Sequence, residues 1–359
     1  MSSTQILRNP LADPLERTPS SHSSISSDLE RELRFFGGLL IQQAGILLNL
    51  PQIVMATAAT LFQRFYFVTS FLNFGIRDVS AGCLFLASKL EEKSARIRDI
   101  INVYDYLLQL INWSHLHQNN SSNSHTHSHS DLVNHLTRQA HHSIQSNPIL
   151  PPQIKSTFSS HLQSKLNSNP SNPSQPSHSI SSNSNQFHYT PMNYFSQEFF
   201  DRKEAIVVAE MQILKRLGFH VQVQHPYSAM VNYLQVLNLT DNLILSQRAW
   251  SYLNDSLLTP LPALYPPTHL ATMSIYMAAN DHQIQLPETW WELFDISQES
   301  ELETMSSILA NIYSPSLNLN SSQNQKESIW LRVSKLPISK EGVRDLIETL
   351  NTQSSSNPS

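Results

Sequence analysis

The stretch DVSAGCLFLASKL, residues 78–90, decides the fold. Its large apolar residues recur at helical spacing, and Asp78 is placed to cap the helix that they predict. Small residues interrupt the apolar ones throughout, namely Ala81, Gly82, Cys83, Ala87 and Ser88. Because small side chains let neighbouring helices approach closely, we expect this helix to lie in the middle of a helical bundle.

Four further helices are predicted around this central one. Ser27, followed by Glu30 three residues later, fits a capping box and opens a helix that runs to about Leu48. Pro51 suits the first turn of a second helix, and Gly218 suits the end of the last one. The four predicted ranges are 27–48, 51–71, 98–112 and 197–217.

A second helical series follows and predicts a second bundle. Its expected helices cover 227–237, 241–258, 268–279, 288–294 and 297–313. Within the two series, CLFLASK (83–89) lines up with SIYMAAN (274–280), in the order small, large, aromatic, large, small, small, polar. The sequence therefore predicts an all-α protein with two five-helix bundles, over 27–218 and 225–314.

Ser, Asn, Gln and His crowd the segments outside these helices. Such segments bury too little apolar surface to offset the entropy of ordering, so we expect disorder in residues 1–26 and in an insert of the first bundle at about 115–190. The C-terminal tail, 315–359, contains a possible amphipathic helix at 339–350 that docks on the second bundle or binds another protein.

Composition excludes several classes of protein. The net charge of −5 argues against nucleic-acid binding, and a single cysteine excludes disulfides and cysteine-based zinc sites. No apolar run reaches the length of a membrane span, which predicts a soluble intracellular protein. Phosphate loops and hydrolase motifs are missing, so neither an enzyme nor a cofactor is expected. Alternating His125, His127 and His129 in a low-complexity tract do not predict a metal site.

Two charged residues stand within apolar helix faces. Lys89 shares one side of its helix with Gly82, and Glu210 lies between Ile206 and Ile213. A charge in such a place needs a partner of opposite sign, hydrogen bonds or an opening to solvent. Three interpretations remain open at this point: Lys89 extends into water, it pairs with Glu210, or both residues bind another molecule.

Four segments carry a resemblance to a known family. They are LIQQAGILLNLPQIVMAT (40–57), LASKLEEKSARIRDIINV (86–103), AEMQILKRLGFHVQVQHPYSAMVNYLQVL (209–237) and AWSYLNDSL (249–257). In them the chain resembles the cyclins, and cyclin L most of all. The resemblance implies a tandem cyclin fold that binds and activates a cyclin-dependent kinase.

The resemblance also implies which residues touch the kinase. In cyclins, a lysine at the end of the third helix and a glutamate in the fifth contact the kinase beside its mobile αC helix, and Lys89 and Glu210 occupy these positions. Leu90, Glu91, Glu92 and Leu214 flank them and are the next candidates. The implied partner is a transcription- or splicing-class kinase of the PITSLRE type or a related one, with transcription or splicing factors as further partners, in the nucleus.

Two departures limit the resemblance. The printed sequence ends in NTQSSSNPS, without the Arg/Ser-rich run common in animal cyclin L, and GGLLIQQAG (37–45) stands where cell-cycle cyclins carry a docking motif. An alternative class is the nucleic-acid adaptor related to transcription factor IIB, which also pairs two cyclin folds. Such a protein needs cationic helix ends and normally a zinc ribbon, and neither is evident.

Overall fold

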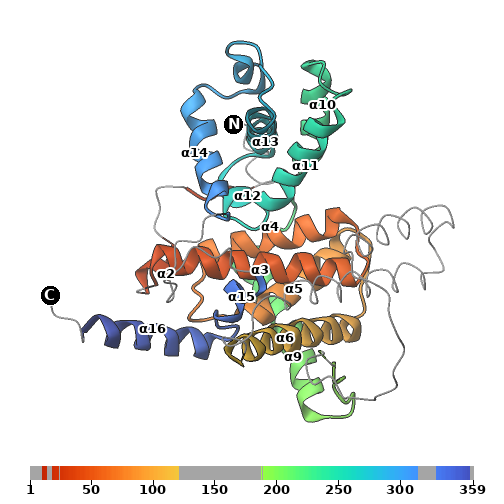
Figure 1. Cartoon of the computed structure of the whole chain (residues 1–359). Coiled ribbons are helices and arrows are strands. Elements are labelled where there is room, and N and C mark those ends of the chain that lie inside the picture. The colour runs from red at the N-terminus through yellow and green to blue at the C-terminus, as the bar shows by residue number, and fades with distance from the viewer. Residues whose placement is uncertain are drawn as a thin grey trace, which may run out of the picture.

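The computed structural model describes residues 10–13, 18–23, 25–120, 187, 189–313 and 329–355, and in these ranges it contains helices and no strands. Two helical bundles are stacked, with the second above the first in Figure 1. The first bundle contains α2 (Pro19–His22), α3 (Ser27–Leu47), α4 (Gln52–Val68), α5 (Ile76–Leu90), α6 (Ile97–Asn120) and α9 (Gln197–Arg216). The second contains α10 (Tyr227–Val236), α11 (Leu243–Ser256), α12 (Leu261–Leu264), α13 (Pro267–Asp281), the 3-10 helix η1 (Trp290–Phe294) and α14 (Glu299–Ala310). The all-α prediction is confirmed.

Helix α5 lies at the centre of the first bundle, as its small residues predict. Cys83, Leu84 and Ala87 are fully buried, and α5 packs against α3, α4, α6 and α9. Helix α13 holds the corresponding place in the second bundle. Ser274 of α13 is buried like Cys83 of α5, and Asn280 of α13 is exposed like Lys89 of α5. The two aligned heptapeptides therefore occupy equivalent central helices.

Three predicted helix starts need correction. The side chain of Ser26, not Ser27, caps α3 by accepting a hydrogen bond from the Leu29 amide, at 3.2 Å. Glu30 turns inward instead of closing a capping box, because its carboxylate binds the buried Arg34. Asp78 is not a cap either, since α5 begins two residues earlier, after Gly75. Asn242, not Asp241, caps α11.

Asp255 of α11 is engaged inside the second bundle. Its carboxylate accepts a hydrogen bond from the Tyr313 hydroxyl at 2.6 Å, and burial raises its pKa. It therefore ties the end of the second bundle to α11.

The two bundles meet where α3 and α4 approach the end of α11. A Cβ on Gly38 would lie only 3.1 Å from the Leu258 Cα, so glycine permits this contact. Gln52 donates hydrogen bonds to the Tyr227 hydroxyl at 3.1 Å and to Asn254 at 2.9 Å. Apolar packing and polar contacts thus hold the bundles together.

The C-terminal helices, α15 (Ile329–Ser334) and α16 (Lys340–Ser355), bury their apolar side chains in the core of the first bundle, whereas docking on the second bundle was one of the two expectations. Arg332 of α15 donates two hydrogen bonds of 2.6 Å to the carboxylate of Glu32, which is 2% exposed. A buried carboxylate requires a cation of this kind, and the sequence does not show which cation supplies it. Val343 of α16 is buried in the same core.

None of the helices in the described ranges is long and apolar enough to cross a membrane. Nor do those ranges contain a group of three or more His, Cys, Asp and Glu side chains placed to hold a metal ion. The three alternating histidines, and the predicted disorder of most of the insert, lie outside the described residues.

Candidate functional site

The two charged residues singled out in the sequence bind each other. The Lys89 ammonium donates a hydrogen bond to Glu210 Oε1 at 2.6 Å, joining the end of α5 to the middle of α9. The side chain of Lys89 is 43% exposed and that of Glu210 is 14% exposed, so the pair is open to solvent on one side. Lys89 Nζ also lies 4.0 Å from the centre of the Phe85 ring. The interpretation that the two residues pair is therefore correct.

Pairing leaves most of the hydrogen-bonding capacity of both groups unused. An ammonium carries three donors, and a carboxylate has two acceptor oxygens. Within the described part of the chain, Lys89 makes one hydrogen bond and Glu210 accepts one on Oε1. An exposed ion pair contributes about 0–1 kcal/mol to stability, which is too little to explain two charges in apolar faces. Two donors of Lys89 and Oε2 of Glu210 therefore have no hydrogen-bond partner within the described part of the chain.

Close packing of α5 on α9 positions this pair. Gly82, seven residues before Lys89, faces α9 so closely that an added Cβ would lie 2.9 Å from the Ala209 Cβ and 3.2 Å from the Glu210 amide nitrogen. Helix α9 is fixed at its start by the Ser196 cap and ends before Gly218, whose φ of 58° lies in the left-handed region that glycine favours. A glycine at 82 thus sets the separation of the two charged side chains.

Replacing this glycine is expected to disturb both the fold and the pair. In Gly82→Val, the added methyl groups must push α9 away, because overpacking of a tight helix contact costs about 1–3 kcal/mol. Thermal unfolding followed by circular dichroism measures the loss. Ala205→Val adds similar bulk on a half-buried position of α9 and serves as the control. Equal melting temperatures for the two variants would contradict the close packing.

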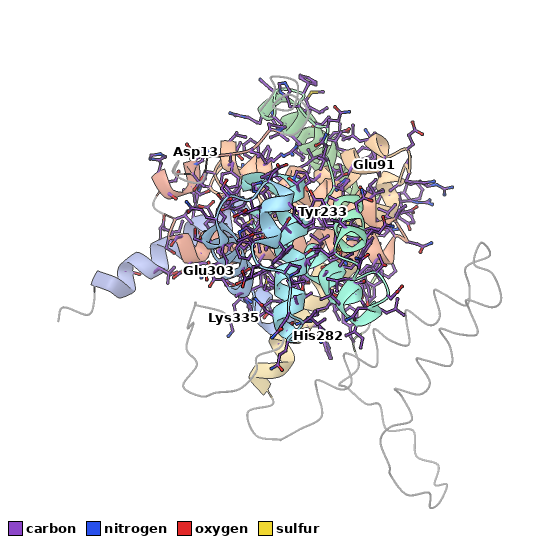
Figure 2. All side chains as sticks on the ribbon, turned by 90° about the horizontal axis from the view of Figure 1, so that it is seen from above. Asp13, Glu91, Tyr233, His282, Glu303 and Lys335 are labelled. Atoms are coloured by element: carbon purple, nitrogen blue, oxygen red, sulfur yellow. The ribbon has the colours of Figure 1, made fainter. Side chains whose placement is uncertain are left out.

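The four flanking candidates fall into two groups. Leu90 is 40% exposed and Glu92 is also exposed, beside the end of α5, whereas Leu214 is half-buried and packs on the core of the first bundle. Glu91 lies at the edge of the molecule in Figure 2 but is directed to α4, where it accepts a hydrogen bond from Thr57 Oγ1 at 2.7 Å. Leu90 and Glu92 are therefore accessible to a partner, while Glu91 is engaged inside the chain.

Thr57 links Glu91 to a histidine from the segment between the bundles. Thr57 Oγ1 lies 2.8 Å from His225 Nε2, and since its one proton goes to Glu91, the imidazole donates from Nε2. Burial lowers the pKa of His225, against the opposing effect of Glu91. The imidazole thus joins α4 to the segment that leads into α10.

Sequence reasoning missed a row of apolar residues on α9. Phe200, Val207 and Met211 are 51%, 47% and 57% exposed, and their spacing of seven and four places them along one side of the helix. Glu210 borders this row, three residues after Val207. The signal was present, because α9 carries apolar residues on two faces and only one of them is needed for the core. We define the α5–α9 surface as Phe85, Lys89, Leu90, Phe200, Val207, Glu210 and Met211.

Known proteins are similar to this chain in sequence. A protein-family model described as the cyclin N-terminal domain matches residues 13–115, which include α3, α4, α5 and most of α6. Cyclin-L2 of Homo sapiens is 33% identical over 299 residues, which are 83% of this chain and 43% of the relative. The first bundle thus matches the cyclin N-terminal domain, and over 83% of its length the chain is similar to a cyclin of the L type.

A second relative is similar over a longer stretch. Cyclin-L1 of Homo sapiens is 31% identical over 327 residues, which are 90% of this chain and 48% of the relative. The chain thus spans less than half the length of these two relatives. Among solved structures, a chain of the yeast RNA Pol II CTD kinase CTDK-1 complex matches at a TM-score of 0.47 and 16% identity, covering 98% of this chain and 82% of that chain.

Proposed function

We propose that this chain is the regulatory subunit of a cyclin-dependent kinase, and that the α5–α9 surface binds the kinase beside its αC helix. The observation that carries the proposal is the Lys89–Glu210 pair, which is open to solvent at the border of an apolar row on α9 that the described part of the chain leaves exposed. The remaining donors of Lys89 and the second oxygen of Glu210 are suited to carbonyl and amide groups of a partner's backbone. In this proposal Leu90 and Glu92 extend the contact with the kinase, and the half-buried Leu214 supports the surface from the core side of α9.

The mechanism follows from what a kinase requires. Its catalytic lysine must pair with a glutamate of αC before the nucleotide phosphates are held correctly. A rigid apolar surface that binds αC only in the inward position favours the active state through differential affinity. Phe200, Val207 and Met211 supply apolar contacts, while Lys89 and Glu210 fix the register. This chain then performs no chemistry of its own.

The similarity to Cyclin-L1 and Cyclin-L2 supports a partner of the transcription or splicing class, such as a PITSLRE-type kinase. On the same ground we propose a nuclear location, with transcription or splicing factors as additional partners. We also propose that residues 27–218 and 225–314 each form one cyclin box.

Reconstitution tests the proposed function. The purified chain is mixed with a purified PITSLRE-type kinase, and phosphate transfer from ATP to a peptide substrate is measured with and without the chain. If the active state of the free kinase is populated at about one part in a hundred, activity is expected to rise about 100-fold. A cell-cycle kinase serves as the control for partner class. Failure to bind or stimulate either kinase would contradict the proposal.

A further inference from the structure

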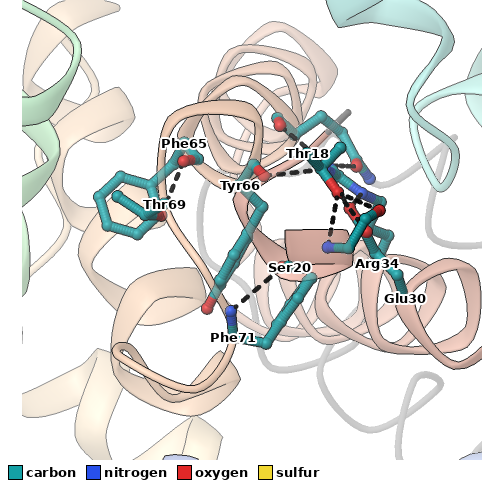
Figure 3. A network of polar contacts seen from close by, with 10 residues as sticks. Thr18, Ser20, Glu30, Arg34, Phe65, Tyr66, Thr69 and Phe71 are labelled. Atoms are coloured by element: carbon teal, nitrogen blue, oxygen red, sulfur yellow. Dashed lines mark hydrogen bonds and ion pairs between the residues drawn. The ribbon is translucent and has the colours of Figure 1, made fainter. Parts of the chain in front are cut away.

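The N-terminal segment is fastened to the first bundle by side-chain hydrogen bonds of Thr18 and Ser20. Thr18 Oγ1 donates a hydrogen bond to Glu30 Oε2 at 2.6 Å and accepts one from the Ser21 amide at 3.2 Å, as Figure 3 shows around Thr18 and Glu30. Two residues later, the buried Ser20 accepts a hydrogen bond on Oγ from the Phe71 amide, at 3.4 Å. The sequence predicts a disordered tail here, but these side-chain contacts hold α2 against α3 and α4.

The charge network below Thr18 is already complete. Arg34 is 3% exposed, and burial lowers its pKa against the opposing effect of Glu30. All five N–H donors of Arg34 have acceptors. Nε donates to Glu30 Oε1, and Nη2 donates to the same oxygen and to the Tyr66 carbonyl. Nη1 donates to the side-chain and backbone oxygens of Gln63. Glu30 therefore has Oε2 left for the Thr18 proton, and Arg34 has no donor left for another anion.

Thr18 is also followed by proline, which is the minimal recognition feature of proline-directed kinases. The chain contains four such dipeptides, beginning at Thr18, Thr190, Thr259 and Ser314. Thr259 is 3% exposed and hydrogen-bonded to the Ser256 carbonyl, and Ser314 lies outside the described residues. Thr190 is exposed, and Thr18 is partly exposed in a segment that a four-residue helix secures. Local opening of so short an element requires little free energy, so Thr18 is accessible to an enzyme.

We propose that Thr18 is a phosphorylation site for a proline-directed protein kinase, and that its phosphorylation releases α2 from the first bundle. The Thr18 hydroxyl oxygen attacks the γ-phosphorus of ATP and forms a new O–P bond. The bond from the γ-phosphorus to the bridging oxygen breaks, ADP leaves with the electron pair, and the hydroxyl proton passes to the carboxylate base of the kinase. The modifying kinase need not be the partner named under the proposed function.

Phosphorylation of Thr18 releases the segment for two reasons: it adds negative charge beside Glu30, and it removes the hydroxyl proton that Glu30 accepts. The phosphate ester brings a charge of about −1.5 to −2 next to the Glu30 carboxylate, and it no longer donates the hydrogen bond that Oε2 accepts. Arg34 cannot compensate, because all its donors are in use. The same segment reaches the second bundle, where the Ala12 amide donates to the Ala263 carbonyl at 2.7 Å. Asp13, in the N-terminal segment, and Glu91, at the end of α5, lie on opposite sides of the molecule in Figure 2.

The test uses the full chain, a purified proline-directed cyclin–kinase pair and Mg-ATP. A free Thr-Pro peptide in the same tube reports that the kinase is active, and peptide mass mapping identifies the modified residues. Hydrogen–deuterium exchange then compares the modified and unmodified chains over residues 18–25 and around Phe71. We expect phosphate on Thr18 and about tenfold faster exchange at both places, the change that loss of one charge-assisted hydrogen bond implies.

Two variants test separately where the chain is phosphorylated and whether phosphorylation releases the segment. Thr18→Val removes the hydroxyl, so it blocks modification and accelerates exchange at Phe71 without kinase. Thr190→Ala removes an exposed Thr-Pro site elsewhere in the described chain and should leave both modification of Thr18 and exchange unchanged. The site is refuted if Thr18 stays unmodified while the free peptide is consumed. The release is refuted if Thr18 carries phosphate and the Phe71 amide exchanges at its original rate.

Discussion

Exchanging the two charges of the α5–α9 surface, Lys89→Glu together with Glu210→Lys, is expected to abolish kinase binding while the fold stays intact. The two side chains bind each other at 2.6 Å, so the exchanged pair still attracts and the contact between α5 and α9 is kept. The kinase, however, meets reversed charges. At position 89 it finds a carboxylate, which only accepts hydrogen bonds, and at position 210 it finds an ammonium, which only donates them. The double exchange thus separates a purely structural ion pair from a binding pair.

The expected loss of affinity is large. Placing the wrong charge against a partly buried hydrogen-bonded group of a partner costs about 2–5 kcal/mol, or roughly a 30-fold or greater rise in Kd. Titration calorimetry with the purified kinase measures the affinity, and the melting temperature of the free chain reports on the fold.

A matched control exists at the end of the central helix of the second bundle. Arg248 of α11 and Asp281, at the end of α13, form an ion pair of 2.7 Å with side chains 46% and 38% exposed. Arg248→Asp with Asp281→Arg should leave kinase binding unchanged. If the Lys89 and Glu210 exchange also binds as tightly as the parent chain, then the pair only joins α5 to α9 and the assigned interface is wrong.

The sequence was sufficient to predict the longer helices and their order because local signals set them, but the short helices α2, α12 and α15 were not expected. Small residues identified α5 as a central helix, its alignment with 274–280 indicated α13 as its counterpart, and Gly218 was expected at the end of α9, which stops at Arg216. The exact first residue of a helix was harder to predict. Ser26 and Ser27 are equally suitable N-caps by residue type, and only the backbone conformation selects Ser26 as the cap of α3. Helix α6 runs to Asn120, beyond its predicted end at Asn112, because polarity alone does not end a helix.

Contacts between distant segments were not predictable in the same way. One sequence can show that Lys89 and Glu210 each need a partner, but the choice between pairing and solvent depends on the approach of α5 to α9. Likewise, Glu32 and Arg332 are 300 residues apart, and no local pattern marks them as partners. The exposed row on α9 was overlooked because Ile206 and Ile213 already accounted for one apolar face.

Removal of one partner from the buried network in α3 is expected to have the largest effect on stability. Arg34 and Glu30 are 3% and 6% exposed and lie one helical turn apart, with an Nη2–Oε1 distance of 2.7 Å. In Arg34→Met the Glu30 carboxylate stays buried without its cation, and the Gln63 and Tyr66 carbonyls each lose a donor. Breaking a buried pair in this way costs about 3–5 kcal/mol. Urea unfolding followed by far-ultraviolet circular dichroism measures the difference.

The same network yields a sharper comparison when both charges are removed. In the double variant Arg34→Met with Glu30→Leu, no uncompensated charge remains, and apolar replacement of a buried pair is often neutral. Most of the lost stability should therefore return, although Thr18 loses its acceptor and α2 is held less firmly. Arg31→Met, which breaks the more exposed pair with Asp28, should cost only about 0–1 kcal/mol. Equal losses for Arg31→Met and Arg34→Met would mean that burial does not decide the strength of the two pairs.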